Sequence, residues 1–118
     1  MSTQVLSIDD FKRLPHHSSS HAQRIGDAAK DYLEAADSHS SAVIRFSDMQ
    51  SFISATGMAK CWDSLAAIRQ IEAAIGEIRD HFSNTVVHDS LEMTHNRIKD
   101  LLRKSEQRVK QLATFVER

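Results

Sequence analysis

Apolar residues recur at steps of three and four along most of this chain. That spacing places them on one face of an α-helix, which has about 3.6 residues per turn. The pattern predicts an all-α fold with three long helices and a short N-terminal helix. We expect helices over residues 8–14, 20–56, 58–82 and 87–117, and a disordered tail over residues 1–6.

The short N-terminal helix has recognisable signals at both ends. Ser7 is suited to the N-cap position, and Asp10 adds an acidic group to the first turn. Pro15 ends the helix, because the residue before a proline is disfavoured in the helical region. The polar residues 16–20 that follow are expected to form a linker.

The first long helix contains one ambiguous segment. Residues 37–41 (DSHSS) carry side chains that compete for backbone hydrogen bonds, so the sequence leaves open whether the helix breaks there. Gly57 is expected to end this helix, because glycine is the usual residue just after a helix C-terminus. The short segment 83–85 (SNT) has the composition of a turn and separates the last two helices.

The second long helix has the most regular apolar stripe. Its steps of three and four from Ile68 onward match a heptad seam between packed helices. We assign this stripe to the core or to a dimer interface. It consists of Leu65, Ile68, Ile71, Ile75, Ile78 and Phe82.

The last helix ends in apolar residues, namely Leu112, Phe115 and Val116. An apolar C-terminal turn either docks on the bundle or binds a partner protein. We assign these three residues to partner binding.

Long helices with narrow, alanine-rich apolar faces shield one another incompletely in so short a chain. A second copy would cover the remaining surface, and two-fold dimers are the commonest assembly. We therefore predict a helical homodimer. The alternative is a monomeric three-helix bundle.

The composition supports a single helical domain. The chain has 118 residues, the size of one domain, and only three glycines and one proline, which are too few for the turns of a β-rich fold. The net charge of −1 argues against a strong general attraction to nucleic acids or membranes. A single cysteine, the lack of a signal peptide pattern and the lack of an apolar run of about 20 residues point to the cytoplasm.

Seven histidines raise the question of a metal site. His16, His17 and His21 lie close together, but no carboxylate or thiolate stands near them at ligand spacing. Glu92 and His95 form a Glu-x-x-His pair, which di-iron bundles use twice, and no second copy is present. Glu77 and His81, one turn apart, are also an ordinary surface pair. We therefore expect no metal and no cofactor.

Catalytic patterns are also lacking, so we do not expect an enzyme. Cys61 falls on an apolar stripe, where a buried thiol behaves as a small hydrophobic group. No Gly-x-Ser-x-Gly elbow or glycine-rich phosphate loop occurs. The stretch from Arg97 to Lys110 holds six basic and two acidic residues, and could contact phosphates. It is more simply the solvated face of an amphipathic helix, so direct nucleic-acid binding is not expected.

In its length, its long helices and its apolar C-terminal residues Leu112, Phe115 and Val116, the chain resembles the QslA-type antiactivators. These proteins sequester LuxR-type quorum-sensing transcription factors. The resemblance implies a bacterial homodimer that binds the ligand-binding domain of the regulator and blocks its dimerisation, and hence its DNA binding.

A second resemblance is to secreted helical-hairpin proteins of the WXG type. Trp62 lies near an expected turn between helices, at the edge of the apolar stripe, as the tryptophan of that family does. However, Asp63 and Ser64 follow it, so the Trp-x-Gly motif is missing. A type III secretion chaperone is a further helical protein of this size, and both remain alternatives to the antiactivator.

Overall fold

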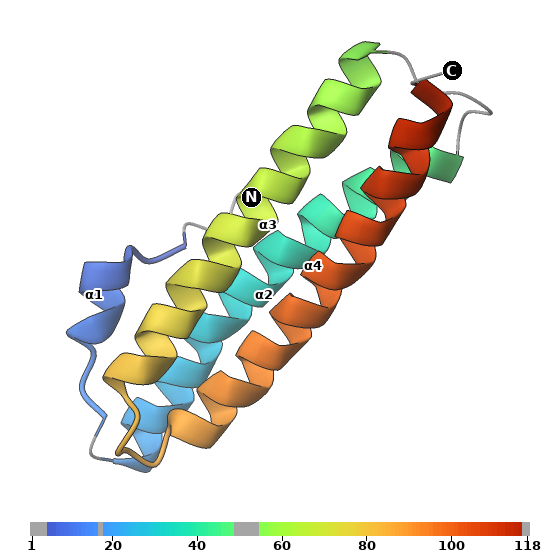
Figure 1. Cartoon of the computed structure of the whole chain (residues 1–118). Helices are drawn as coiled ribbons and strands as arrows, with labels where there is room; N and C mark the ends of the chain where they lie inside the picture. The colour runs from blue at the N-terminus through green and yellow to red at the C-terminus, as the bar shows by residue number, and fades with distance from the viewer. Residues whose placement is uncertain (1–4, 17, 49–54, 117–118) are drawn as a thin grey trace.

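Three long helices lie side by side as an elongated bundle in the computed structural model (Figure 1). The structure describes the backbone of residues 5–16, 18–48 and 55–116, and the side chains within 5–16, 18–45 and 57–112. The helices are α1 (Ile8–Lys12), α2 (Ser19–Asp48), α3 (Ala55–His81) and α4 (His88–Val116), and the described residues include no strand. Helices α2 and α4 run in the same direction and α3 runs opposite to both (Figure 1). The predicted all-α bundle is confirmed.

Helix α1 begins as its sequence predicts. The Ser7 hydroxyl accepts a hydrogen bond from the backbone N–H of Asp10 over 3.2 Å, so Ser7 is the N-cap. The α-helix ends at Lys12, two residues earlier than expected, and the N–H of Leu14 still bonds to the carbonyl of Phe11. Phe11 is completely buried and anchors this short helix on the bundle.

Helix α2 continues through the ambiguous segment 37–41 without a break. Ser40 lies within that segment and is buried, and its hydroxyl accepts a hydrogen bond of 2.9 Å from the hydroxyl of Ser105 on α4. A serine weakens a helix when its hydroxyl competes for the helix's own backbone groups. Here the Ser40 oxygen has a partner on another helix, and α2 stays helical on both sides of it.

The expectation that Gly57 ends a helix is wrong. Gly57 lies inside α3, which begins at Ala55, and no described glycine has a positive φ. A helix-ending glycine normally adopts a left-handed conformation, which Gly57 does not. The end of α2 is described to Asp48, and the expected extension of that helix over 49–54 lies outside the described residues.

The predicted turn between α3 and α4 is present. The Thr85 hydroxyl donates to the carbonyl of Phe82 over 2.8 Å and accepts from the N–H of Val87 at 3.4 Å. These bonds satisfy backbone groups at the end of α3 and lead into α4 at His88.

Buried apolar side chains form two separate clusters along the bundle. We call them the large core, at the α1 end, and the small core, at the end where α3 begins. The large core consists of Phe11, Ile25, Ala29, Tyr32, Ala36, Ile68, Ile75, Ile78, Phe82, Val87, Leu91 and Ile98. The small core consists of Val43, Met58, Cys61, Leu65, Val109 and Leu112.

The predicted stripe on α3 lies inside the single chain. Five of its six residues are at most 1% exposed, and Ile71 is partly buried against the large core. Helices α2 and α4 of the same chain therefore cover it, and a dimer would have to use another surface. No described helix is both long enough and apolar enough to cross a membrane.

Candidate functional site

A buried histidine between α3 and α4 is the main polar feature of the bundle interior. His95 lies on the inner face of α4 and is 4% exposed. Its ring lies against Gly76 on α3, where a Cβ atom would be only 3.2 Å from Nε2. Glycine at position 76 therefore leaves the space that the imidazole ring occupies.

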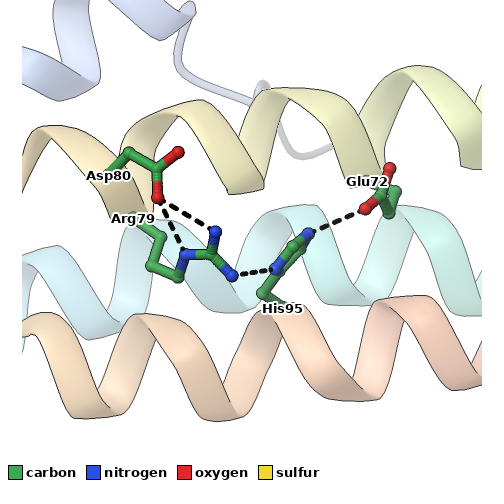
Figure 2. Close-up of polar contacts among 4 residues, drawn as sticks. All are labelled: Glu72, Arg79, Asp80 and His95. Atoms are coloured by element: carbon green, nitrogen blue, oxygen red, sulfur yellow. Dashed lines mark hydrogen bonds and ion pairs between the residues drawn. The ribbon is translucent and has the colours of Figure 1, made fainter. Parts of the chain in front are cut away.

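Both ring nitrogens of His95 have partners on α3. Nε2 lies 2.9 Å from Oε1 of Glu72, and Nδ1 lies 2.9 Å from Nη1 of Arg79 (Figure 2). A guanidinium group only donates hydrogen bonds, so Nδ1 must accept from Arg79. Nε2 then carries the ring proton and donates a hydrogen bond to Oε1 of Glu72, which fixes the tautomer of the ring.

The arginine of this network is held in turn by a neighbouring carboxylate. Nε and Nη2 of Arg79 donate to Oδ1 of Asp80 over 3.1 and 2.9 Å (Figure 2). Glu72, His95, Arg79 and Asp80 therefore form a continuous chain of hydrogen bonds, which we call the His95 network. Because the buried ring is bonded on both sides, this network fixes how α3 and α4 pack against each other.

Catalysis by His95 would need a free ring nitrogen facing a substrate. The lone pair on Nδ1 is engaged by Arg79, and the proton on Nε2 is engaged by Glu72. No hydroxyl or thiol among the described contacts of His95 could be activated as a nucleophile. The arrangement therefore suits a structural role.

Glu92 and His95, half of a di-iron motif in the sequence, do not form a common site. His95 turns inward to α3, whereas Glu92 is exposed and gathers with His88 and Asp89 in the first turn of α4. The ligand atoms of those three residues lie within 4.8 Å of one another. The Asp89 side chain is fully exposed, and the N-terminal end of a helix carries partial positive charge. Both facts disfavour tight binding of a cation.

Glu77 and His81, one turn apart on α3, both contact the last residue of α1. Glu77 lies 3.4 Å from Nζ of Lys12, and Nε2 of His81 lies 3.2 Å from the carbonyl of the same lysine. This lysine is the last residue of α1. The two side chains therefore bind the C-terminal end of α1 to α3.

The three clustered histidines are not a uniform solvated linker. The ring of His16 packs edge-on against Phe82, with centroids 5.3 Å apart. His21 lies in the first turn of α2 and is partly buried, and His17 lies outside the described residues. At least one of these histidines therefore contributes to the core rather than to a ligand site.

Cys61 is buried, as its position on the apolar stripe predicts. It is fully buried in the small core, and burial raises the pKa of its thiol. A raised pKa keeps the thiol protonated near neutral pH, which disfavours nucleophilic chemistry.

The residues assigned to partner binding divide into two groups. Leu112 is 8% exposed and belongs to the small core, so its side chain is not presented to a partner. Phe115 and Val116 lie in the last turn of α4, and their side chains lie outside the described ones. The structure brings Leu112 together with the start of α3, because Met58 and Cys61 belong to the same cluster.

Trp62 is an exposed apolar residue near the start of α3, at the same end of the bundle as the small core. It is 45% exposed and lies next to the buried Cys61 in the second turn of α3. The sequence indicated its position at the edge of the stripe, but not which way the ring faces. Only the packed helices determine that exposure.

The basic stretch of α4 is partly neutralised by local ion pairs. Asp100 lies 2.7 Å from Arg103 and 3.3 Å from Lys104, and Glu106 lies 4.0 Å from Arg69 on α3. Hydrogen bonds from Arg103 and Lys104 lower the pKa of Asp100. These contacts agree with the solvated helix face that the sequence predicts.

Comparison with protein-family models, with curated proteins and with solved structures finds no match to this chain.

Proposed function

We propose that this protein is a cytoplasmic, non-catalytic regulator that sequesters a LuxR-type transcription factor. In this proposal it binds the inactive, monomeric form of the factor and thereby prevents its dimerisation and DNA binding. The class of partner comes from the resemblance to QslA-type antiactivators. The structural support comes from an exposed apolar group at one end of the helical bundle.

The observation that carries the proposal is the exposure of Trp62. Tryptophan buries a large area on binding and is enriched among the residues that dominate interface energies. Trp62 stands on a long helix, so its position is fixed before a partner arrives and little ordering entropy is lost. Helix α3 begins and α4 ends at the same end of the bundle (Figure 1). Trp62 and the apolar residues Phe115 and Val116 therefore belong to one end of the molecule.

The polar chemistry of the described residues supports binding rather than catalysis. The buried His95 is bonded on both ring nitrogens, and Cys61 is buried with a raised pKa. Neither group is available to a substrate. A protein of this kind acts by binding to the surface of its target protein.

Sequestration follows from mass action. A regulator that binds only the monomer of its target removes that monomer from the equilibrium with the active dimer. At a free regulator concentration 100-fold above Kd, the monomer is stabilised by about 2.7 kcal/mol. A shift of that size reduces the active dimer strongly without any chemical step.

The test begins with a tagged pull-down from native lysate and identification of the co-eluting proteins by mass spectrometry. We expect a transcription factor whose DNA binding falls when the purified protein is added. Trp62→Arg should weaken that complex at least 10-fold while the far-ultraviolet circular dichroism stays unchanged. Met93→Arg is the matched control, because Met93 is 60% exposed on a different part of the bundle.

Phe115→Arg tests the C-terminal contribution in the same assay. It should also weaken binding, whereas Leu112→Arg is unsuitable because it would place a charge in the small core. If Trp62→Arg and Phe115→Arg both bind the target as the unmodified protein does, the proposed surface is wrong. If no transcription factor is recovered, the sequestration proposal itself fails.

The second candidate function is that of a secretion chaperone or a secreted WXG-like hairpin protein. The same exposed tryptophan favours it, because Trp62 lies close to the connection between α2 and α3. Co-purification with an exported protein would support the chaperone. Recovery of the protein itself from the culture medium would support the secreted hairpin.

A further inference from the structure

One contact of the His95 network depends on the ring being neutral. Nδ1 of His95 accepts a hydrogen bond of 2.9 Å from Nη1 of Arg79, and a guanidinium group has no lone pair to offer in return. A protonated imidazole ring carries a hydrogen on both nitrogens. Protonation of Nδ1 would therefore place one N–H group against another, and one positive charge against another.

The contact on the opposite side of the ring responds in the opposite direction. Nε2 lies 2.9 Å from Oε1 of Glu72, and it donates to that carboxylate whether the ring is neutral or charged. A charged donor makes a stronger hydrogen bond to a carboxylate than a neutral donor does. A proton added to the ring therefore favours the contact with Glu72 and opposes the contact with Arg79 (Figure 2).

The packing around the ring determines which partner moves. The His95 side chain is 6% exposed and its ring lies against Gly76, so the ring has little room to swing away from α3. The Arg79 side chain is 25% exposed and is held separately by two hydrogen bonds to Asp80. Arg79 can therefore move away from the ring while it keeps its carboxylate partner.

The charges around the ring allow it to accept a proton. Glu72 and Asp80 contribute two negative charges and Arg79 contributes one positive charge, so a protonated His95 makes the network formally neutral. Among the described residues, the other charged groups at this level of the bundle make no hydrogen bond or ion pair with the ring. They are Glu92 and Lys99 on α4, Lys30, Asp31 and Glu34 on the stretch of α2 that faces α4, and Lys12 on α1 with its partner Glu77.

We propose that the His95 network is a pH-sensitive contact between α3 and α4. With a neutral ring, His95 holds α3 at Glu72 and at Arg79, which lie about two helical turns apart. With a protonated ring, it keeps Glu72 and releases Arg79. Acidification through the range in which histidine changes charge, about pH 8 to pH 5, thus loosens the end of α3 that leads into the turn before α4. This contact is a property of the free protein and does not depend on the proposed function.

The first measurement follows the NMR signals of the two imidazole nitrogens of His95 in the full chain, from about pH 8 to pH 5. At the high end we expect a proton on Nε2 and none on Nδ1, and Nδ1 should gain a proton as the pH falls. Arg79→Met removes the opposing donor and should move this transition to higher pH by roughly 1 unit. Glu72→Gln removes the favourable charge and should move it to lower pH.

Hydrogen exchange then tests the release of Arg79. His95→Gln is the matched variant, because a glutamine amide can accept from Arg79 and donate to Glu72 but does not titrate. We compare the exchange of backbone amides 76–82 in the unmodified protein and in His95→Gln at the same pH, which cancels the pH dependence of the exchange chemistry. The ratio of the two rates should rise about 10-fold from the high end of the range to the low end, because one hydrogen bond to a charged group is lost.

Two other histidines at this end of the bundle also titrate, and variants separate them from His95. His81 bonds to the carbonyl of Lys12, and His16 packs against Phe82. Both histidines are present in His95→Gln, so their effects cancel in the ratio. In a His81→Gln background the ratio should rise as before. In an Arg79→Met background it should stay constant, because no arginine remains to be released.

Circular dichroism at each pH shows whether a variant remains folded. A His95 ring that stays neutral throughout the range, or that carries its proton on Nδ1 at the high end, overturns the proposal. A ratio that does not change with pH overturns it too, as does a ratio that rises equally in the Arg79→Met background. The NMR signals of the unmodified protein decide the first point even if a variant does not fold.

Discussion

The large core and the small core are built from the same three helices but differ in the described side chains that fill them. Among these side chains the large core has 12 buried residues, including three aromatic rings, and α1 packs against it. The small core has six described residues, including Met58 and Cys61, and the side chains of residues 46–56 and 113–118 lie outside the described ones. Buried apolar area is the main source of stability, so among the described residues most of it resides at the α1 end.

The His95 network ties α3 to α4 beside the large core, and the bond between Ser40 and Ser105 lies between the two cores. Regions with fewer buried contacts open locally at lower free energy. The described contacts therefore predict that the small core opens before the large core.

The largest expected effect comes from breaking the large core at Phe82. This ring is fully buried and packs against Phe11, His16 and His81, with centroids 6.4, 5.3 and 4.8 Å away. Phe82→Ala should lower the free energy of unfolding by about 3–5 kcal/mol, as measured by urea denaturation. Val86→Ala is the control, since Val86 is 81% exposed nearby. A loss below about 1 kcal/mol would contradict this account of the core.

The next effect comes from the His95 network. His95→Leu leaves Glu72 and Arg79 without their shared partner and should cost about 2–3 kcal/mol in the same assay. Gly76→Ala would bring a Cβ atom 3.2 Å from Nε2 of His95, a ring held on both sides by Glu72 and Arg79, so the crowding should outweigh the higher helix propensity of alanine. In the His95→Ala background the imidazole is gone, so Gly76→Ala should stabilise the protein by up to about 1 kcal/mol. Equal costs of Gly76→Ala in both backgrounds would show that His95 does not fill the space above this glycine.

A smaller effect is expected between the two cores. Ser105→Ala leaves the buried Ser40 hydroxyl without its hydrogen bond and should cost about 1 kcal/mol. Replacing both serines by alanine should cost less, because no unsatisfied polar group remains. Hydrogen exchange should show the small core opening before the large core in all these variants. Simultaneous opening of both would mean that the bundle is one cooperative unit.

The smallest expected effect is a loss of folding stability at alkaline pH, to which one titrating group in each core contributes. Burial raises the pKa of Tyr32, in the large core, and of Cys61, in the small core, above their usual values of 10.0 and 9.0. Their contribution to stability is therefore fully present below those values and is lost as pH rises through the higher folded-state pKa. The Tyr32 hydroxyl also donates to the carbonyl of Leu6, a bond that tyrosinate cannot make.

Urea midpoints measured from pH 8 to pH 11, which spans about one unit on either side of the usual cysteine and tyrosine values, test this expectation. Tyr32→Phe should reduce the alkaline loss at the high end of the range. Cys61→Ala should reduce the loss of stability that begins at lower pH, because cysteine has the lower usual pKa of the two residues. A pH profile that neither variant changes would assign the alkaline loss to other groups.

Local sequence patterns were sufficient to predict the helices and several of the residues at which the helices begin or end. Ser7 caps α1 because its hydroxyl reaches an N–H only three residues away. The α3 stripe identifies its buried face because helical periodicity puts those residues on one side. The expected Gly57 helix end was wrong because glycine allows a left-handed conformation but does not require it.

The sequence by itself determined the all-α class, the three long helices and the buried side of α3, because these depend on spacing of about one helical turn. Only the tertiary structure decided the rest. It pairs His95 with Glu72 and Arg79 instead of Glu92, buries Leu112, and leaves Trp62 exposed. These outcomes depend on which helix lies opposite a given side chain, and that depends on contacts between residues far apart in the chain.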